Sequence, residues 1–349
     1  MRLTVTLVIA VCMLAMSVSV REASAATAAA NKKAQAAKTI TKAKAQTRVR
    51  GTIPAGRAPI KSTRKRPLIA RILAPSEGHL AGLNRGDDPL DLRSSVALVV
   101  DQDTNEVLFE KNKNAVLPIA SVTKLMTALV TVEANLPLGE ELEVSRDEMV
   151  RASTRSKLRP GFEMTRGTAL HLALMSSENR AAQLLGRTYP GGVKRFVEAM
   201  NARARLLGMN DSHFADPTGL SPENRSSASD LVRLVKAAYE YDIIRQYSVS
   251  GELELPVGRR TVSYRNTNRL TDNPEWDIGL QKTGYISAAG RCLVMQTVIE
   301  GKRVVMVLLD SVGKYSRLGD AERIRDFIES TGLSKSKPAA LAPPARRAM

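Results

Sequence analysis

The stretch PIASVTKLMTALV, residues 118–130, decides how the chain folds, because it combines the clearest helical pattern with a hydroxyl and an amine at close spacing. Its apolar residues recur at Val122, Leu125, Met126, Leu129 and Val130. Positions i, i+3, i+4, i+7 and i+8 share one face of a helix, so the pattern predicts a buried helix that stops near Pro137. A helix with such a face needs other elements packed around it, and the flanking sequence supplies them.

Runs typical of β-strands stand on both sides of this region. Before it, residues 95–100 and 107–109 are separated by turn residues, which predicts a hairpin. After it, further strands are expected at residues 280–286, 292–299 and 304–309. Helical patterns occupy residues 170–175, 181–185, 193–207, 231–239 and 320–328. Strands at both ends of a helical insert predict an α/β fold, with one sheet built from both ends of the chain and a helical lobe beside it.

Ser121 and Lys124 are three residues apart, so both project from one side of the predicted helix. A serine hydroxyl becomes a good nucleophile when a base takes its proton, and a lysine can be that base if burial or nearby positive charge lowers its pKa. The same spacing occurs at Ser62/Lys65, Ser311/Lys314 and Ser334/Lys337. Only Ser121 opens a buried helix, and this context selects it as the candidate.

Two further motifs carry polar groups. Ser177-Glu178-Asn179 falls in a short break between two expected helices, where a hydroxyl and a carboxamide can face a cleft; capping of the second helix is the alternative. Lys282-Thr283-Gly284 lies on an expected strand, where it offers a charge and a hydroxyl for a carboxylate and a glycine for close backbone approach. A solvated strand edge is the alternative there.

Together these three motifs resemble the set found in penicillin-binding proteins and class A β-lactamases. The resemblance to the low-molecular-weight penicillin-binding proteins, the serine D-Ala-D-Ala peptidases, extends over about residues 87–333, and the penicillin-binding protein 7 type D-alanyl-D-alanine endopeptidases are the nearest group. It is carried by residues 88–101, 118–128, 175–182, 207–220 and 282–286. The resemblance implies a β-lactamase/transpeptidase-like fold, a mixed sheet flanked by helices with an all-helical subdomain and a cleft between them.

The resemblance also implies roles for individual residues. Ser121 would be the acylated nucleophile, Lys124 its general base, and Ser177 a proton relay. The backbone N–H groups of Ser121 and Tyr285 would form the oxyanion hole. Glu178 receives no role, the charge of Lys282 is expected to help keep Lys124 neutral, and no cofactor or metal is implied. The residues expected to bind substrate are Asn179, Lys282, Thr283, Gly284 and Tyr285.

Several activities fit these motifs. The nearest group implies a D-alanyl-D-alanine endopeptidase that hydrolyses the D-Ala–diaminopimelate cross-links of peptidoglycan, with peptide stems as substrate and β-lactam antibiotics as acylating inhibitors. A D-Ala-D-Ala carboxypeptidase that trims pentapeptides is the alternative, although such enzymes usually have a second C-terminal β domain that this chain does not show. A non-catalytic peptidoglycan-binding protein is less favoured because all three motifs are intact. A class A β-lactamase would need a Glu-x-x-x-Asn loop, which is missing between Asn179 and Lys282.

The charge distribution separates tails from a neutral domain. Of the net charge of +17, residues 26–66 contribute twelve Lys and Arg without an acid, whereas residues 67–330 hold 34 basic and 34 acidic residues. We therefore expect a basic disordered tail at residues 26–86, a peptidase domain at 87–333 and a second disordered tail at 334–349. The basic tail is a candidate for anionic envelope components, and a neutral domain argues against a nucleic-acid partner.

The first residues indicate the compartment. A charged start, an apolar run from Leu3 to Met16 and small residues before Ala26 predict a secretory signal peptide at residues 1–25, hence a periplasmic protein without a membrane anchor. Removal of this segment would discard Cys12, so Cys292 is expected to be a buried strand cysteine. The histidines are scattered, and no metal site is expected.

Overall fold

The computed structural model describes residues 75–86, 88–149, 156–257 and 260–332, all of which belong to one compact unit. The predicted signal peptide, most of the basic tail and the tail at 334–349 lie outside these residues. The predicted boundary at residue 86 is wrong in part, because residues 75–86 already belong to the folded unit. They include helix α2 (Glu77–Leu80), where the Glu77 N–H bonds the Ala288 carbonyl and the Glu77 carboxylate pairs with Arg225.

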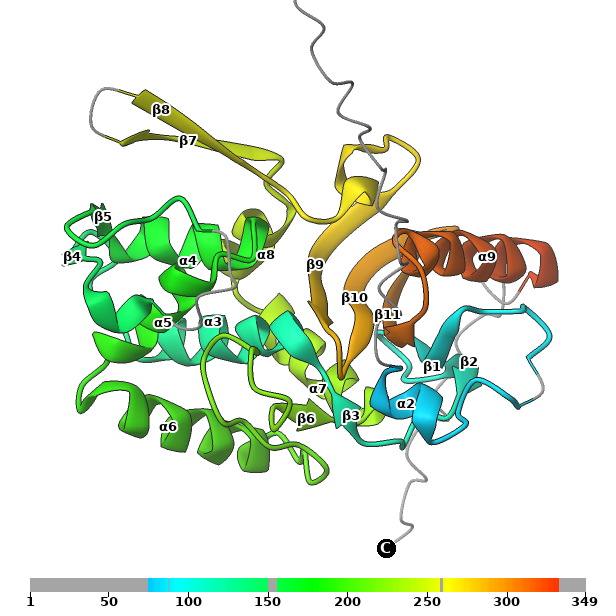
Figure 1. Ribbon diagram of the computed structural model, residues 1–349. Coiled ribbons are helices and arrows are strands. Elements are labelled where there is room, and N and C mark those ends of the chain that lie inside the picture. Colours follow the sequence, from blue (N-terminus) through cyan, green and yellow to red (C-terminus); the bar gives the residue numbers. More distant parts are fainter. Residues whose placement is uncertain (1–74, 87, 150–155, 258–259, 333–349) are drawn as a thin grey trace, which may run out of the picture. The chain divides into compact units, whose positions relative to one another are not determined.

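A five-stranded sheet joins both ends of the described chain, as predicted (Figure 1). Its order is β2-β1-β11-β10-β9, and every neighbouring pair is antiparallel. The N-terminal hairpin therefore pairs with the C-terminal three strands through β1 and β11. The bounds are β1 (Ser94–Asp101), β2 (Val107–Lys111), β9 (Asp277–Ile286), β10 (Gly290–Ile299) and β11 (Lys302–Ser311).

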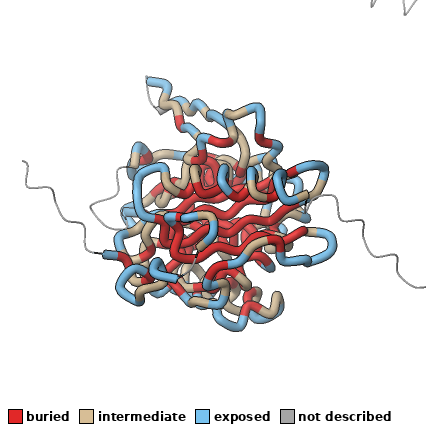
Figure 2. The backbone as a smooth tube through the Cα atoms, turned by 90° about the vertical axis from the view of Figure 1, so that its right-hand side faces the viewer, coloured by how far each residue is buried: buried red, intermediate tan, exposed pale blue. Residues whose placement is uncertain are grey.

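Both faces of the sheet are covered, which explains why all of β1 is buried (Figure 2). Side chains alternate between the faces of a strand. Val96 and Leu98 belong to the core on the side of α7 (Ala228–Tyr239), whereas Ala97 and Val99 belong to the core on the side of α9 (Ser316–Thr331). The expected fold class, a sheet flanked by helices with a helical subdomain, is confirmed.

The helical subdomain is built around α3 (Lys124–Glu133), which follows the 3-10 turn η1 (Ala120–Thr123). Eight consecutive residues of α3 are buried, because α4, α5, α6 and α7 all pack against it. The neighbouring helices are α4 (Arg166–Met175), α5 (Asn179–Arg187), α6 (Gly192–Leu206) and α8 (Asp242–Val249). The buried helix predicted from residues 118–130 is thus the centre of this subdomain.

Smaller elements complete the unit. Helix α8 and the hairpin of β7 and β8 that follows it were not predicted from the sequence, and neither were the short strands β3, β4, β5 and β6. Short strands β3 and β6 pair near η1, and β4 and β5 pair beside α4. Their bounds are β3 (Leu117–Pro118), β4 (Glu141–Glu143), β5 (Glu163–Thr165), β6 (Arg225–Ser226), β7 (Glu252–Val257) and β8 (Arg260–Arg265), with 3-10 turns η2 (Arg146–Glu148) and η3 (Arg269–Asp272).

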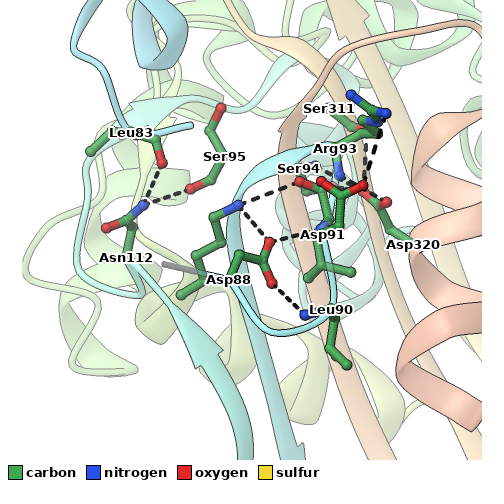
Figure 3. Close-up of polar contacts among 12 residues, drawn as sticks. Leu83, Asp88, Leu90, Asp91, Arg93, Ser94, Ser95, Asn112, Ser311 and Asp320 are labelled. Carbon is green, nitrogen blue, oxygen red and sulfur yellow. Dashed lines mark hydrogen bonds and ion pairs between the residues drawn. The ribbon is translucent and has the colours of Figure 1, made fainter. Parts of the chain in front are cut away.

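Buried polar contacts fix the start of β1 (Figure 3). The Lys111 ammonium lies 2.8 Å from the Asp88 carboxylate, and both side chains are less than a tenth exposed. Asp320 of α9 accepts hydrogen bonds from the backbone N–H groups of Arg93 and Ser94 and from the Ser94 hydroxyl. Removing one partner of such a buried pair leaves a charge without compensation, so these contacts hold α9 and the sheet in one arrangement.

Candidate active site

Ser121 lies in η1, between strand β3 and helix α3, where the backbone is tightly constrained. Ala120 before it has φ 49°, in the left-handed region that costs a non-glycine residue about 1–2 kcal/mol. Gly284 of β9 lies directly against this turn: a Cβ built on it would be 3.0 Å from the Ile119 carbonyl oxygen and 3.0 Å from the Ser121 nitrogen. The glycine of the Lys-Thr-Gly motif, expected to allow close backbone approach, therefore lets the edge strand of the sheet reach the turn that holds Ser121.

Lys124 occupies the first turn of α3 and is completely buried. Its Nζ donates hydrogen bonds to Ser121 Oγ at 2.9 Å, Asn179 Oδ1 at 2.7 Å and the Thr218 carbonyl oxygen at 2.6 Å. The Asn179 and Thr218 oxygens can only accept. A neutral amine has two N–H groups and one lone pair, so these two acceptors would take both N–H groups. The lone pair is then left facing the Ser121 hydroxyl, in reach of its proton.

Burial lowers the pKa of Lys124 from its ordinary value of 10.5 to about 7, against the opposing charges of Asp216 and Glu178. Burial also lowers the pKa of Lys282 well below its usual range, and the positive charges of Lys124 and Arg317 lower it further. Loss of hydration is the main cause at Lys124. Because the charges of Lys124 and Lys282 repel one another, a charged Lys282 would also disfavour the charged form of Lys124, and this expected contribution stays a prediction.

The Ser177-Glu178-Asn179 motif forms the break between α4 and α5, as predicted. Ser177 has φ 60°, and Glu178 caps α5 by accepting a hydrogen bond from the Arg180 N–H. The capping role considered for this motif is therefore filled by Glu178. Asn179 reaches Lys124, but none of the hydrogen bonds found among the described residues joins the Ser177 hydroxyl to Ser121 or Lys124.

The Lys282-Thr283-Gly284 motif lies on β9, at the edge of the sheet. Lys282 is fully buried, and its Nζ donates to the Thr283 carbonyl oxygen at 3.0 Å. The Thr283 and Thr267 hydroxyl oxygens are 2.7 Å apart. Tyr285, the next residue, is 44% exposed. The strand thus presents a buried lysine, a hydroxyl and an accessible residue in sequence beside Ser121.

Sequence reasoning gave no role to the loop of residues 216–221, although its Thr218 carbonyl accepts the shortest of the three Lys124 hydrogen bonds. The Asp216 carboxylate holds this loop by accepting hydrogen bonds from the Thr218, Gly219 and Ser221 N–H groups. Burial opposes ionisation of Asp216, but these hydrogen bonds and one from the Thr218 hydroxyl outweigh it and lower its pKa. The signal available in the sequence was the turn-forming Asp-Pro-Thr-Gly itself.

Arg317 of α9 was also missed. It is 9% exposed, and neither its Nε nor its Nη1 has a hydrogen-bond partner in the described part of the chain. Its charge acts on Lys282, so the two cations lie near one another. A buried guanidinium with open donors beside a buried lysine is suited to a carboxylate ligand.

Within residues 75–86, 88–149, 156–257 and 260–332, there is no group of three or more side chains placed to bind a metal ion. In the same residues, no helix combines the length and the apolar character needed to cross a membrane. Cys292 is buried on β10, as predicted. The chemical groups gathered around Ser121 are a hydroxyl, an amine, amide groups and cations.

Comparison with known proteins identifies the family of the chain. The family model of Peptidase S11, D-alanyl-D-alanine carboxypeptidase, matches residues 84–313. D-alanyl-D-alanine endopeptidases of Escherichia coli and Pseudomonas aeruginosa are each 46% identical over 253 residues, which are 72% of this chain and 81% of theirs. A D-alanyl-D-alanine carboxypeptidase structure from Mycobacterium tuberculosis, 25% identical, has a TM-score of 0.64 and covers 71% of this chain and 94% of that one. The Streptomyces K15 DD-transpeptidase, 24% identical, shares the fold with a TM-score of 0.63 over 68% of this chain and 98% of its own. The chain therefore belongs to the Peptidase S11 family.

Proposed function

We propose that this protein is a D-alanyl-D-alanine endopeptidase that hydrolyses peptide cross-links of peptidoglycan through an acyl-enzyme on Ser121. The observation that carries the proposal is the 2.9 Å contact between Lys124 Nζ and Ser121 Oγ, with burial holding the pKa of that lysine at about 7. Relatives that are 46% identical bear the name endopeptidase, and this favours the cross-link as the substrate.

Acylation begins with transfer of the Ser121 hydroxyl proton to the neutral Lys124 amine. The serine oxygen attacks the carbonyl carbon of the D-Ala residue, and the negative charge that develops on the carbonyl oxygen is held by the backbone N–H groups of Ser121 and Tyr285. Collapse of the tetrahedral intermediate breaks the C–N bond, and the proton passes to the leaving amine, with Ser177 as the relay. The acyl group remains as an ester on Ser121.

Deacylation repeats these steps with water. Lys124 has returned its proton to the leaving group and is again a neutral base, so it can take a proton from water as the water attacks the ester. Collapse of the second tetrahedral intermediate breaks the bond to Ser121 Oγ, and the proton on Lys124 passes to that oxygen, which releases the acid and restores the serine. The Thr218 carbonyl and Asn179 hold the amine in the same place for both half-reactions. One buried lysine thus serves as base twice.

Substrate binding uses the two motifs on either side of the serine. Asn179 accepts from Lys124 through its Oδ1, which leaves its NH₂ group to donate to an amide oxygen of the substrate. Lys282, Thr283 and Arg317 would hold the carboxylate next to the scissile bond. An arriving carboxylate supplies the counter-charge that these buried cations need, so the substrate itself favours the charged form of Lys282.

Carboxypeptidase activity remains the second candidate, because the family model carries that name. The acceptor residue of a cross-link bears a carboxylate placed like that of a terminal D-Ala, so the same anchor fits both substrates. A competition between a cross-linked muropeptide dimer and a monomeric pentapeptide, with products resolved by mass, separates the two activities. We expect the dimer to be cut to monomers. Release of free D-Ala with the dimer left intact would make the protein a carboxypeptidase.

The nucleophile is tested separately with labelled penicillin. A β-lactam presents its strained amide in place of the scissile bond and leaves a stable ester, so wild-type protein should be labelled at Ser121 and Ser121→Ala should remain unlabelled. Labelling of Ser121→Ala at the wild-type level would contradict the assignment of this serine.

We further propose that the protein acts in the periplasm after removal of residues 1–25. The support is the apolar run before Ala26 in the sequence, a segment outside the described residues, and the peptidoglycan substrate itself. The mature protein isolated from cells should begin at Ala26, which intact mass measures directly. A mature chain that keeps Met1 would contradict cleavage.

A further inference from the structure

A cavity opens beside the exposed end of β9, next to the site described above. Its volume is about 360 Å³, and its lining includes Tyr285, Arg291 and Lys314. Tyr285 pairs with Arg291 across β9 and β10, and Thr283 lies two residues before Tyr285 on β9. Two strand residues span about 7 Å, so this cavity begins about two residues of an extended peptide away from the proposed carboxylate anchor.

Positive charge is concentrated around this cavity. The Arg291 guanidinium lies 4.5 Å from the centre of the Tyr285 ring, while Arg269 and Lys314 lie 5.0 and 5.1 Å from the centre of the Tyr315 ring. In the described part of the chain, none of the ion pairs within 4.0 Å includes these three cations or Arg317. Arg291, Arg269 and Lys314 therefore lie on aromatic rings without an ion-pair partner among the described residues. The Asp310 carboxylate lies behind the lining, against the backbone of Gly290.

The arrangement has an energetic cost that an anion would relieve. Burial lowers the pKa of Arg317, and the charge of Arg291 lowers it further, so these two guanidinium groups repel one another. The hydrogen bond from Lys314 lowers the pKa of Tyr315, and the charges of Arg269, Lys314 and Arg291 add to this effect. Like charges held together near a cleft are typical of a site whose ligand carries the opposite charge.

We propose that the cavity lined by Tyr285, Arg291 and Lys314, here called the Arg291 pocket, binds a second carboxylate of the peptidoglycan peptide stem. The inference rests on the proposed function. The anchor of Lys282, Thr283 and Arg317 accounts for the carboxylate next to the scissile bond, and the Arg291 pocket lies further along the same strand. Acidic residues of a stem extended along β9 would bring their carboxylates there, and the tyrosine rings would cover the apolar part of the stem.

The carboxylate bound in the Arg291 pocket can come from either of two peptide stems, the acyl-donor stem or the leaving stem. The acyl-donor stem is present in both a pentapeptide and a cross-linked dimer, whereas the leaving stem with its additional acidic groups is present only in the dimer. Penicillin carries one carboxylate, which the anchor accounts for, so acylation by penicillin should not use the Arg291 pocket. These three substrates therefore separate binding in the pocket from the chemistry at Ser121.

The test compares Arg291→Gln, Lys314→Gln and the double variant with wild type. Lys194→Gln, an exposed lysine on α6 in the helical subdomain, is the control for loss of surface charge. We expect the double variant to lose about tenfold in kcat/KM on the dimer, mainly through KM, because two partly exposed charge-assisted contacts are removed. The rate of penicillin acylation and the activity of Lys194→Gln should stay at the wild-type level.

The results show which stem supplies the carboxylate, and they also show whether the proposal fails. A loss on the dimer alone assigns the pocket to the leaving stem, and an equal loss on dimer and pentapeptide assigns it to the donor stem. Unchanged kcat/KM on both, or an equal fall in penicillin acylation, overturns the proposal. Wild-type protein that cuts neither peptide would instead refute the proposed function. Lys314→Gln keeps the test valid if Arg291→Gln does not fold, because Lys314 is exposed.

Discussion

Lys124 is surrounded by three hydrogen-bond acceptors, and this geometry links its protonation state to the reaction. With three protons, the lysine donates to Ser121 and cannot act as a base. With two, its lone pair faces the serine hydroxyl. The number of protons on one buried nitrogen therefore decides whether the site is active.

The first prediction is a pH dependence of penicillin acylation governed by Lys124. Because burial lowers its pKa to about 7, the active form is lost as the pH falls through 7, and the rate should drop about tenfold for each further pH unit.

The contribution of Lys124 to the free energy of unfolding also increases with pH. The folded pKa lies below the unfolded value of 10.5, so unfolding binds a proton between these values, and stability should rise with pH from about 7 to about 10. Stopped-flow acylation across pH 5–9 measures the rate, and a flat profile would contradict Lys124 as the base.

The second prediction concerns Glu178, whose charge raises the pKa of Lys124. Glu178→Gln keeps an oxygen to cap α5 and removes the charge, so the pKa of Lys124 should fall and the acidic limb of acylation should move to lower pH. The pH–rate profile of the variant measures the shift. Glu198→Gln, which removes an exposed carboxylate of α6, is the control. A limb displaced to higher pH would show that Glu178 does not act through its charge.

At the scale of elements, the site depends on two segments, distant in sequence, whose backbones pack against η1. Gly284 brings β9 against Ser121, and Gly219 brings the loop of residues 216–221 against Ala120. Gly219 has φ 78°, and a Cβ there would lie 2.0 Å from the Ala120 carbonyl oxygen. Close approach of two backbones therefore places the Thr218 carbonyl on Lys124.

The third prediction compares Gly219→Ala with Gly301→Ala. Gly301 has φ 77°, almost the same backbone conformation, but no atom lies within 4 Å of a Cβ built there. Both substitutions carry the left-handed penalty of about 1–2 kcal/mol in unfolding free energy, and only Gly219→Ala also displaces the loop from Ala120. Chemical denaturation and penicillin acylation should show a modest loss of stability for Gly301→Ala with normal acylation, and slow acylation for Gly219→Ala. Equal behaviour of the two variants would refute the role of the close approach.

How far the sequence predicts the molecule also depends on the element. The buried helix α3 and the sheet strands were predicted because their apolar periodicity is strong and local. Strand β7 alternates Glu and Leu over only four residues before Pro256, its Leu253 and Leu255 are only partly buried, and it pairs only with β8, so its signal in the sequence is short. Ser121 and Lys124 lie on one helical turn and could be paired from spacing, whereas the Thr218 carbonyl and Arg317 reach the site through tertiary structure. Every residue has a backbone carbonyl, so no residue type marks the functional one in the sequence.

At the scale of the whole molecule, the net positive charge is confined to segments outside the peptidase unit. Residues 67–330 hold 34 basic and 34 acidic side chains, and thus carry no net charge. Residues 26–66 carry twelve cations without an acid. Attraction of the protein to an anionic surface would then come mainly from this segment rather than from the peptidase unit.

The last prediction is therefore that deletion of residues 26–66 separates catalysis from attachment. Residues 26–66 have few bulky apolar side chains and no apolar periodicity, so this segment is not expected to contribute to a packed core. The thermal unfolding midpoint and penicillin acylation of the deletion variant should therefore match those of the full mature protein. Binding to isolated cell-wall material should weaken, because the twelve cations are lost. The full protein should also release this material as ionic strength rises from about 0.05 to about 0.3 M, since screening shortens the reach of exposed charges below about 10 Å.

A matched variant, with the twelve Lys and Arg changed to Gln at unchanged length, should behave like the deletion if charge is the cause. Loss of folding in the deletion would place part of the segment in the folded unit, and binding that ignores salt would contradict the electrostatic mechanism.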